Sequence, residues 1–262
     1  MAKRLVMAIM AVFALTGAAT AQERLDCDDD WSGGDRERFC EVREIPVAAT
    51  GRLDIDGGLN GGVSVVGWDR DQVLVQAKVT AWADDAAEAR SIAAAVEIAT
   101  DGGRIEADGP RMRDRTSWGV SYLIHTPRRT DLRIETHNGG IGIAGVEGRM
   151  TFEALNGGVA LTDVAGDVQG ETTNGGVSVR LTGDRWRGAG LDVETTNGGV
   201  RLEIPDDYSA RLVTGTVNGG MDVDFPITVQ GRIGRRLETT LGQGGPTISV
   251  RTTNGGVRLT RR

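Results

Sequence analysis

The tripeptide Asn-Gly-Gly recurs along this chain of 262 residues, and it constrains the fold more than any other feature. Its asparagines are Asn60, Asn138, Asn156, Asn174, Asn197, Asn218 and Asn254. From Asn138 onward the steps are 18, 18, 23, 21 and 36 residues. A short recurring spacing is typical of repeat architectures, in which every unit packs mainly against its neighbours. The second half of the chain is therefore expected to be one structural unit repeated several times.

The residues around each tripeptide alternate between apolar and polar. With the asparagine counted as zero, position −4 is Ile134, Phe152, Gly170, Val193, Thr214 and Val250, and position +3 is Ile141, Val159, Val177, Val200, Met221 and Val257. This alternation predicts a strand with one buried face on either side of the tripeptide. Each unit is thus a strand, an Asn-Gly-Gly corner and a second strand.

Asn-Gly is also a common signal for an antiparallel hairpin, so a meander of hairpins is the alternative fold. The same inward positions return in register at every tripeptide, which favours a winding coil. We therefore predict an all-β fold with a parallel β-solenoid, in which equivalent residues stack about 4.8 Å apart. The asparagines and the threonines at position −2 should form ladders. Asn and Gly tolerate positive φ, which is expected at tight corners.

The longer steps indicate insertions at corners. One runs from Gly183 to Gly188, and the other runs from Pro226 to Gly245. Insertions in repeat proteins often form loops on the binding face. Long surface loops also cost little free energy, so loops without a binding role are the alternative interpretation.

The N-terminus resembles a secretory signal peptide over residues 1–21. Lys3 and Arg4 precede an apolar stretch of residues 5–15, and Ala19 and Ala21 fit a cleavage site. A membrane anchor would need about 20 apolar residues. We predict export to the periplasm, the cell surface or the medium, and no membrane-spanning segment. Loss of Lys3 and Arg4 changes the net charge from −7 to −9, which disfavours nucleic acid as a partner.

The two cysteines, Cys27 and Cys40, predict one disulfide in an oxidising compartment. Such a bond would stabilise the fold by about 3 kcal/mol in the chain-entropy model. A redox or metal-binding pair is the weaker alternative, because the spacing matches neither pattern. Residues 22–41 would form a disulfide-closed segment, whose run Asp28-Asp29-Asp30 is interpreted as a solvated acidic turn rather than a calcium site.

Residues 42–127 are less regular and predict a β-rich region with one helix. The helix is expected within residues 84–97, capped by Asp84 or Asp85. Strands are expected near residues 52–55, 63–65, 73–79, 104–106 and 120–125. This region could cap the solenoid of residues 128–262, or it could form irregular first coils of the same sheets.

Two stretches resemble a known bacterial family. The unit from Glu171 to Val179 and the upstream run Val65-Val66-Gly67-Trp68-Asp69 are similar to the DUF4097 family, whose members are proposed to be adhesins with β-strand repeats. The resemblance covers residues 42–262. It implies a β-solenoid-like domain in the cell envelope. It implies no catalytic or ligand-binding residues, so none are transferred to this chain.

No catalytic motif and no cofactor signature is found, so we predict that the protein is not an enzyme. Position −3 carries Glu135, Glu153, Glu171 and Glu194, which should stack on the solvent side of a parallel solenoid. Such a column would have raised apparent pKa values or hold a cation. The alternative is a solvated stripe relieved by neighbours such as Arg133.

Two basic loops carry tryptophan. The first contains Arg111, Arg113, Arg115 and Trp118, and the second contains Arg185, Trp186 and Arg187. Arginine and tryptophan together can bind an anionic glycan. The alternative is that both loops simply face solvent.

Taken together, these patterns predict an adhesin-like interaction or scaffold module of the cell envelope, with an envelope protein or glycan as partner. One alternative is a β-helical enzyme acting on polysaccharide, although Arg180, Arg201, Glu203 and Asp222 are scattered rather than convergent. Another is a structural protein that self-associates through open coil edges. Arg261 and Arg262 at the C-terminal unit are charges expected to block such stacking.

Overall fold

The computed structural model describes residues 24–28, 35–224 and 234–262. The predicted signal peptide of residues 1–21, Asp29, Asp30 and residues 225–233 of the second insertion lie outside the described residues. Among the helices that the structure does describe, none is long and apolar enough to cross a membrane.

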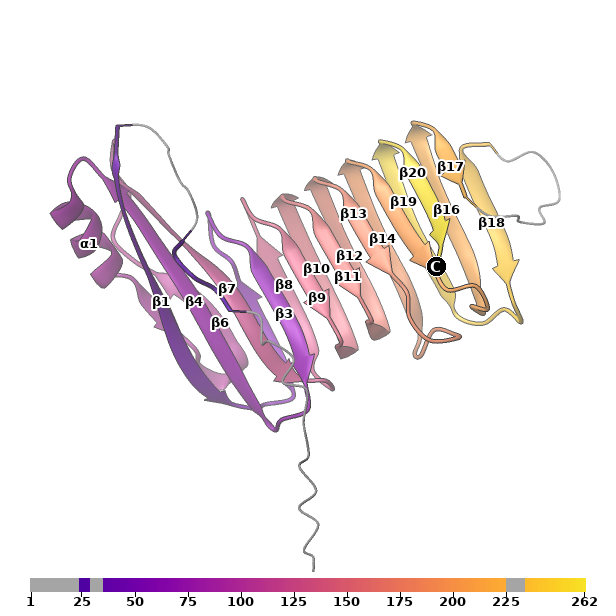
Figure 1. Ribbon diagram of the computed structural model, residues 1–262, viewed down its shortest axis with the longest axis horizontal. Coiled ribbons are helices and arrows are strands. Elements are labelled where there is room, and N and C mark those ends of the chain that lie inside the picture. The colour runs from indigo at the N-terminus through magenta and orange to yellow at the C-terminus, as the bar shows by residue number, and fades with distance from the viewer. Residues whose placement is uncertain (1–23, 29–34, 225–233) are drawn as a thin grey trace, which may run out of the picture.

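Two ten-stranded sheets face each other along an elongated molecule (Figure 1). Sheet A contains, in spatial order, β1 (Glu37–Ala48), β4 (Gln72–Ala83), β7 (Ser117–Pro127), β3 (Val63–Trp68), β9 (Ile141–Ala144), β11 (Val159–Thr162), β13 (Val177–Arg180), β15 (Val200–Ile204), β20 (Val257–Arg261) and β17 (Met221–Val223). Sheet B contains β18 (Arg236–Leu241), β16 (Ala210–Asn218), β19 (Thr247–Asn254), β14 (Gly190–Asn197), β12 (Ala165–Asn174), β10 (Glu147–Asn156), β8 (Asp131–Thr136), β2 (Arg52–Asp56), β6 (Arg104–Asp108) and β5 (Glu97–Ala99).

The coils wind in parallel, which confirms the predicted solenoid. Val159 pairs with Val177 on sheet A, and Glu153 pairs with Glu171 on sheet B. Antiparallel pairing occurs only toward the ends of the sheets, in β1–β4, β4–β7, β5–β6 and β16–β18. Apolar residues of both sheets point inward and form one continuous core. Because like residues lie beside like, every outward position becomes a row running across the coils.

The last coil does not lie at the end of the solenoid. Strand β19 pairs with β14 on one side and with β16 on the other, and β20 lies between β15 and β17. In Figure 1 these C-terminal strands are therefore flanked by strands that precede them in sequence. The expectation that Arg261 and Arg262 block an open end is wrong, because Arg261 pairs with Ile204 inside the sheet.

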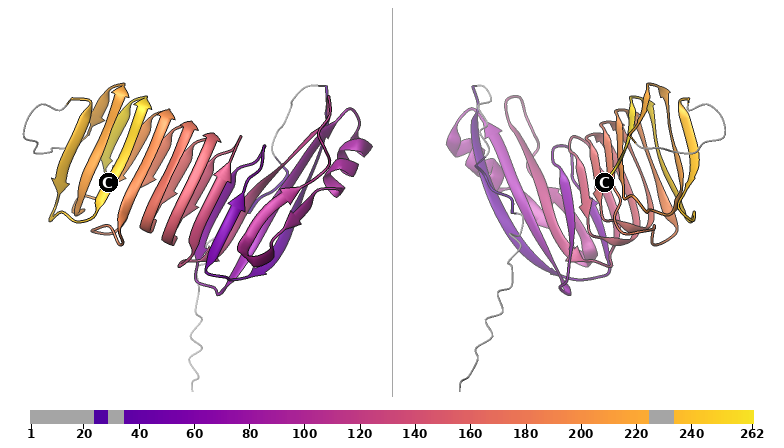
Figure 2. Two further views of the ribbon diagram at one scale, coloured as in Figure 1. Left: turned by 180° about the vertical axis from the view of Figure 1, so that it is seen from behind. Right: turned by 45° about the vertical axis from the view of Figure 1, so that its right-hand side comes forward.

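The N-terminal region both forms a first coil of the solenoid and caps its end, which were the two roles expected from the sequence. Strands β2 and β3 form a first coil that pairs in parallel with β8 and β9. Strands β1, β4 and β7 extend sheet A beyond it, with α1 (Ala86–Ala94) at the outer end (Figures 1 and 2). The predicted helix is confirmed, and the Asp85 side chain caps it by accepting a hydrogen bond of 2.8 Å from the amide of Glu88. A short 3-10 turn, η1 (Asp101–Gly103), follows β5.

The corner asparagines form a continuous hydrogen-bonded ladder, as predicted. From the second member onward, each side-chain amide donates to the side-chain oxygen of the preceding asparagine, in the spatial order Asn60, Asn138, Asn156, Asn174, Asn197, Asn254 and Asn218. The threonines lie on the buried side, where Thr172 donates to the carbonyl of Gly157 at 2.7 Å. The two ladders satisfy both side chains and corner backbone.

The first glycine of each corner is required for a different reason from the predicted one. Gly157 does not have a positive φ. A Cβ atom at Gly157 would lie only 2.1 Å from the carbonyl oxygen of Gly139 in the adjacent coil. The second glycine has more room, since a Cβ at Gly158 would lie 3.2 Å from the oxygen of Gly176. Close approach of neighbouring backbones, rather than left-handed φ, explains the first glycine.

Both insertions contribute to the solenoid itself. In the first, the Trp186 side chain is 4% exposed, and its indole N–H donates to the carbonyl of Gly166 at 3.0 Å. Within the described part of the second insertion, β18 pairs with β16 and covers the end of sheet B. The first insertion therefore adds a buried tryptophan to the core, and the described part of the second adds an edge strand to sheet B.

Both tyrosines of the chain are buried, which predicts how they titrate at alkaline pH. Burial raises the pKa of Tyr208 to about 12, and burial also raises the pKa of Tyr122. A raised pKa in the folded state contributes stability below the pKa of an unfolded tyrosine, near 10, and this contribution is lost as the pH rises further. We expect ultraviolet difference absorbance to show no tyrosinate until the protein unfolds. A tyrosinate signal near pH 10 with the fold intact would contradict this burial.

Candidate functional site

The predicted disulfide is present and joins the N-terminal segment to sheet A. Cys27 and Cys40 are bonded, with 5.8 Å between their Cα atoms. Cys40 lies in β1, opposite Thr80 of β4. The disulfide therefore tethers residues 24–28 to the outermost strand of sheet A and has a structural role.

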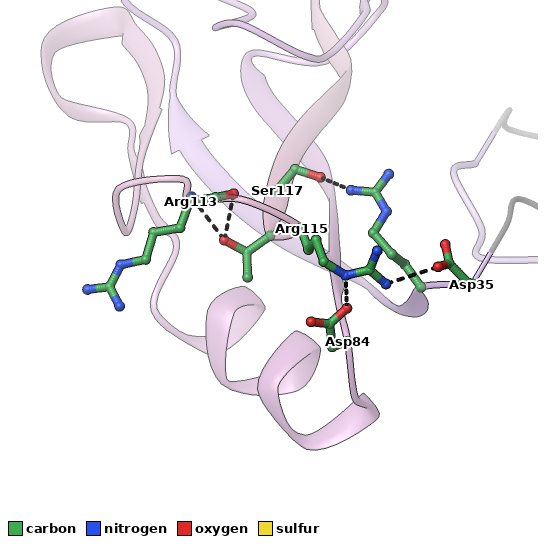
Figure 3. Close-up of polar contacts among 7 residues, drawn as sticks. Asp35, Asp84, Arg113, Arg115 and Ser117 are labelled. Atoms are coloured by element: carbon green, nitrogen blue, oxygen red, sulfur yellow. Dashed lines mark hydrogen bonds and ion pairs between the residues drawn. The ribbon is translucent and has the colours of Figure 1, made fainter.

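The first basic loop forms hydrogen bonds with other residues of the N-terminal region, which we call the N-terminal cap (Figure 3). The guanidinium of Arg115 donates to the Asp84 carboxylate at 2.5 Å and to the Asp35 carboxylate at 3.1 Å. These hydrogen bonds raise the pKa of Arg115, and the bond from Arg115 lowers the pKa of Asp35. The Trp118 indole N–H donates to the carbonyl of Pro110 at 2.8 Å. Arg115 and Trp118 thus hold the loop against the cap, while Arg111 and Arg113 are exposed.

The second basic loop lies elsewhere, at the corner between β13 and β14. Arg187 pairs with Glu147 at 3.2 Å, and Arg185 pairs with Asp184 at 3.0 Å. Trp186 is buried, contrary to the expectation that its ring faces a ligand. The structure therefore does not combine the two loops into one arginine and tryptophan surface.

The glutamate column is present on the outer face of sheet B. Glu135, Glu153, Glu171 and Glu194 pair in sequence across four strands. Asp56 precedes Glu135 in the row, and Arg251 follows Glu194. Arg133 pairs with Glu135, and Arg251 pairs with both Asp192 and Glu194. Among the described residues, no cation pairs with Glu153 or Glu171.

The described residues contain no group of three or more His, Cys, Asp or Glu side chains arranged to hold a metal ion. Within that part of the chain, the column is a row of exposed carboxylates.

Two open hollows flank the column and share Glu135 and Glu153. The first, which we call the leucine groove, has a volume of ≈ 460 Å³ and is lined by Asp56, Gly58, Leu59, Glu135, Thr136, His137, Glu153 and Leu155. The second, which we call the glutamate hollow, has a volume of ≈ 350 Å³ and includes Arg133, Thr151, Glu153, Gln169, Glu171 and Glu194. They are neighbouring hollows on the outer face of sheet B, with Glu135 and Glu153 common to both linings.

The leucine groove owes its shape to the corner of the first coil. Asp56 pairs with Glu135 and Asn60 pairs with Asn138, so the first coil has one more residue between these positions than the second. Gly58 accommodates the extra residue with a φ of 65°. Leu59 then stands outward beside His137 and Leu155, with exposed fractions of 48% for Leu59 and 37% for Leu155.

Larger hollows occur elsewhere but are less suited to recognition. One of ≈ 750 Å³ on sheet A has a floor of corner glycines, and two of its three charged residues, Arg258 and Asp222, pair with each other at 3.0 Å. Another of ≈ 1030 Å³ lies between turns near Asp184 and Gly244. Neither combines exposed large apolar side chains with uncompensated charge, as the leucine groove does.

Reasoning from the sequence missed the leucine groove, although a signal was present. Position −1 is threonine at Thr173, Thr196 and Thr253, and it is leucine at Leu59 and Leu155. A large apolar residue at an outward position of a soluble strand is a candidate contact residue. Attention to the buried positions alone concealed this change.

These features define a class of protein: a parallel two-sheet β-solenoid, stabilised by an asparagine ladder, that displays rows of side chains on rigid outer faces. A family model described as Toastrack DUF4097 matches residues 96–260. The chain belongs to this family, which confirms the resemblance seen in the sequence. No curated protein sequence is significantly similar to the chain.

Several solved structures are similar to the chain at low sequence identity. A proposed cell adhesion protein from Clostridium sporogenes has a TM-score of 0.43 and 10% identity, and the match covers 86% of this chain and 100% of that one. A proposed adhesin from Bacteroides fragilis has a TM-score of 0.39 and 10% identity, covering 86% and 97%. A proposed lipid-binding protein from Parabacteroides distasonis has a TM-score of 0.33 and 9% identity, covering 84% and 96%. At these levels the similarities identify no partner for this chain.

Proposed function

We propose that this protein is an exported, non-enzymatic interaction module of the cell envelope, and that the outer face of sheet B is its binding face. The observation that carries the proposal is the pair of neighbouring hollows, the leucine groove and the glutamate hollow. Exposed leucines lie there beside Asp56 and Glu153, which have no ion-pair partner among the described residues. Exposed apolar groups in a charged surround are typical of binding surfaces.

The scaffold beneath this face supports the same function. Parallel backbone pairing, the asparagine ladder and the buried core fix the strands that carry Glu135, Glu153 and Glu171. A rigid surface loses little conformational entropy when a partner binds. Rows of side chains at strand spacing present an extended surface, so an extended partner can contact several coils at once.

Catalysis on polysaccharide is the second candidate, and the ion pairs of sheet A weigh against it. Arg180 donates to Glu203 at 2.6 Å, and this bond lowers the pKa of Glu203. Arg258 pairs with Asp222 in the same way. Glu203 and Asp222 are thus each bound to an arginine of the same face, whereas glycoside hydrolysis generally needs two carboxyl groups flanking one bond.

Self-assembly through sheet edges is the third candidate. The edge strand β1 carries several charged residues, including Glu37, Glu41 and Arg43, and the edge strand β18 carries Arg236 and Glu238. The other two edges, β5 and β17, are only three residues long. Charged and short edges disfavour pairing between copies.

Charge reversal on the binding face tests the proposal. We expect Glu153→Lys with Glu171→Lys to reduce co-sedimentation of the purified protein with isolated cell envelopes by about tenfold, which corresponds to about 1.4 kcal/mol. The matched control is Ala160→Lys with Ser178→Lys, at exposed positions of the neighbouring strands of sheet A. Equal co-sedimentation of both variants, with both melting as the wild type does, would show that sheet B is not the binding face.

A further inference from the structure

We infer that the leucine groove binds a short basic polypeptide segment in which large apolar side chains alternate with lysine or arginine. This inference rests on the proposed function and specifies the partner of the same face. It is drawn from the apolar, electrostatic and geometric properties of the groove.

The apolar part of the argument is the exposure of Leu59 and Leu155. Among the described residues, only four large hydrophobic side chains are exposed, and these two line the same groove. His137 lies between them, and its side chain is also exposed. The equivalent positions of the central coils are threonines, so the leucines are not required by the corner itself. Covering two leucines with an apolar partner releases water and favours binding.

The electrostatic part is the excess of carboxylates over basic side chains. Asp56, Glu135 and Glu153 line the leucine groove, whose lining contains no lysine or arginine. Of these carboxylates, Glu135 is paired with Arg133. Asp56 accepts a hydrogen bond from the amide of Gly58 at 2.8 Å. Glu153, together with Glu171 beyond it, continues the negative surface into the glutamate hollow. A cationic partner complements this surface, and an anionic one is repelled.

The dimensions fit a polypeptide. The acidic row runs from Asp56 to Glu194 across β2, β8, β10, β12 and β14, a span of four strand spacings or about 19 Å. An extended segment of about six residues covers the same length. Glu153 and Leu155 are two residues apart along β10, or about 6.7 Å, so neighbouring side chains of one segment can reach both residues.

The surface is less suited to a glycan. Sugar rings are commonly bound by exposed faces of Phe, Tyr or Trp, and the one such residue lining the two hollows, Phe152, is only 5% exposed. Anionic glycans would meet the carboxylates of Glu153 and Glu171. Aliphatic leucine beside carboxylate instead matches the side chains of a basic, apolar peptide.

The experiment uses the purified protein and three fluorescent peptides of about six residues. The first alternates lysine and leucine, the second replaces leucine with serine, and the third replaces lysine with glutamate. Fluorescence anisotropy should show binding of the first peptide, at least about tenfold weaker binding of the second, and no binding of the third. Binding of the first should weaken as salt is added, because the charges are exposed.

Variants locate the binding site. Leu155→Ser should weaken binding of the lysine–leucine peptide about tenfold, whereas Val217→Ser, an exposed residue at the far end of the same row, should change it less than about twofold. Glu153→Gln should weaken it about threefold, and Glu97→Gln, an exposed glutamate of β5, should not. All four substitutions are at exposed positions, so each variant is expected to fold.

Each contrary outcome has a definite meaning. Equal binding of the lysine–serine and lysine–leucine peptides would overturn the inference, because charge alone would then explain binding. Equal effects of the groove and control variants would overturn it as well. If no peptide binds while the wild-type protein still sediments with envelopes through sheet B, this inference fails and the proposed function stands.

Discussion

Removal of residues 247–262 is expected to disrupt the C-terminal third of the solenoid, although only the end of the chain is deleted. Strands β19 and β20 lie between β14–β15 and β16–β17, so their loss leaves a gap inside both sheets. The deletion removes Ile248, Val250, Val257 and Leu259, which are almost fully buried. At about 1.5–3 kcal/mol for each side chain, the loss is comparable to the whole stability of a typical domain.

The distinctive consequence concerns strands that remain in the chain. We expect β16 and β18 to lose protection in hydrogen exchange, because their parallel partner β19 is gone. In a solenoid with coils in chain order, deletion of the last coil would affect only the preceding one. Removal of Arg261 and Arg262 alone is the control, and it should have little effect because neither residue is part of the buried core. Unchanged protection of β16 after the full deletion would show that β14 and β16 can pair directly, and that β19 is not needed to hold them in place.

Gly157→Ala is expected to destabilise the protein by about 3 kcal/mol or more, whereas Gly158→Ala should cost about 1 kcal/mol or less. The two glycines are adjacent, and neither has a positive φ, so a difference in backbone conformation cannot explain the contrast. The added Cβ of the first would lie 2.1 Å from the oxygen of Gly139 and 2.4 Å from its carbonyl carbon. These backbone atoms belong to the next coil and cannot move without disturbing its pairing.

Urea unfolding measures this contrast directly. At Gly158 the added Cβ would lie 3.2 Å from the nearest backbone oxygen, so a shift of a few tenths of an ångström suffices. Equal free energies of unfolding for the two variants would mean that the coils are less closely spaced than the structure shows. The same pair of variants can be made at Gly175 and Gly176, where the corresponding distances are 2.2 and 3.3 Å.

The sequence predicted the periodic part of the fold because the periodic signal is local. Alternating apolar positions defined both strands of each coil, and matching registers of Asn156 and Asn174 defined the stacking. The helix was also predicted, since an aspartate cap and a run of alanines are sufficient signals without tertiary contacts.

The order of the coils could not be predicted in the same way. The units around Asn197 and Asn254 have nearly the same sequence, so their strand patterns do not indicate which neighbour each prefers. A weaker signal lay on the outer face. Arg251 occupies the position of the column glutamates and pairs with Glu194, whereas Gly215 offers that glutamate no partner. Opposite charges on adjacent strands stabilise a sheet, so Arg251 favours the observed order.

The candidate site was predicted only in part. Stacking of the glutamates followed from the register, and the leucine groove depended on one extra residue before Asn60, which periodicity alone does not detect. Trp186 was predicted to lie in an exposed loop because its neighbours are charged. Its burial against Gly166 depends on contact with another coil, which cannot be inferred from the insertion itself.

The rows of the binding face depend on the order of the coils, and one pair of disulfide measurements tests that order directly. Glu194 and Arg251 are neighbours on the exposed face of sheet B. Paired strand residues have Cα separations within the range of a disulfide, so Glu194→Cys with Arg251→Cys should oxidise to a bond that peptide mass mapping detects. Glu194→Cys with Gly215→Cys should not, because β19 separates these residues. A bond in the second variant and none in the first would contradict the inserted coil and the binding face built upon it.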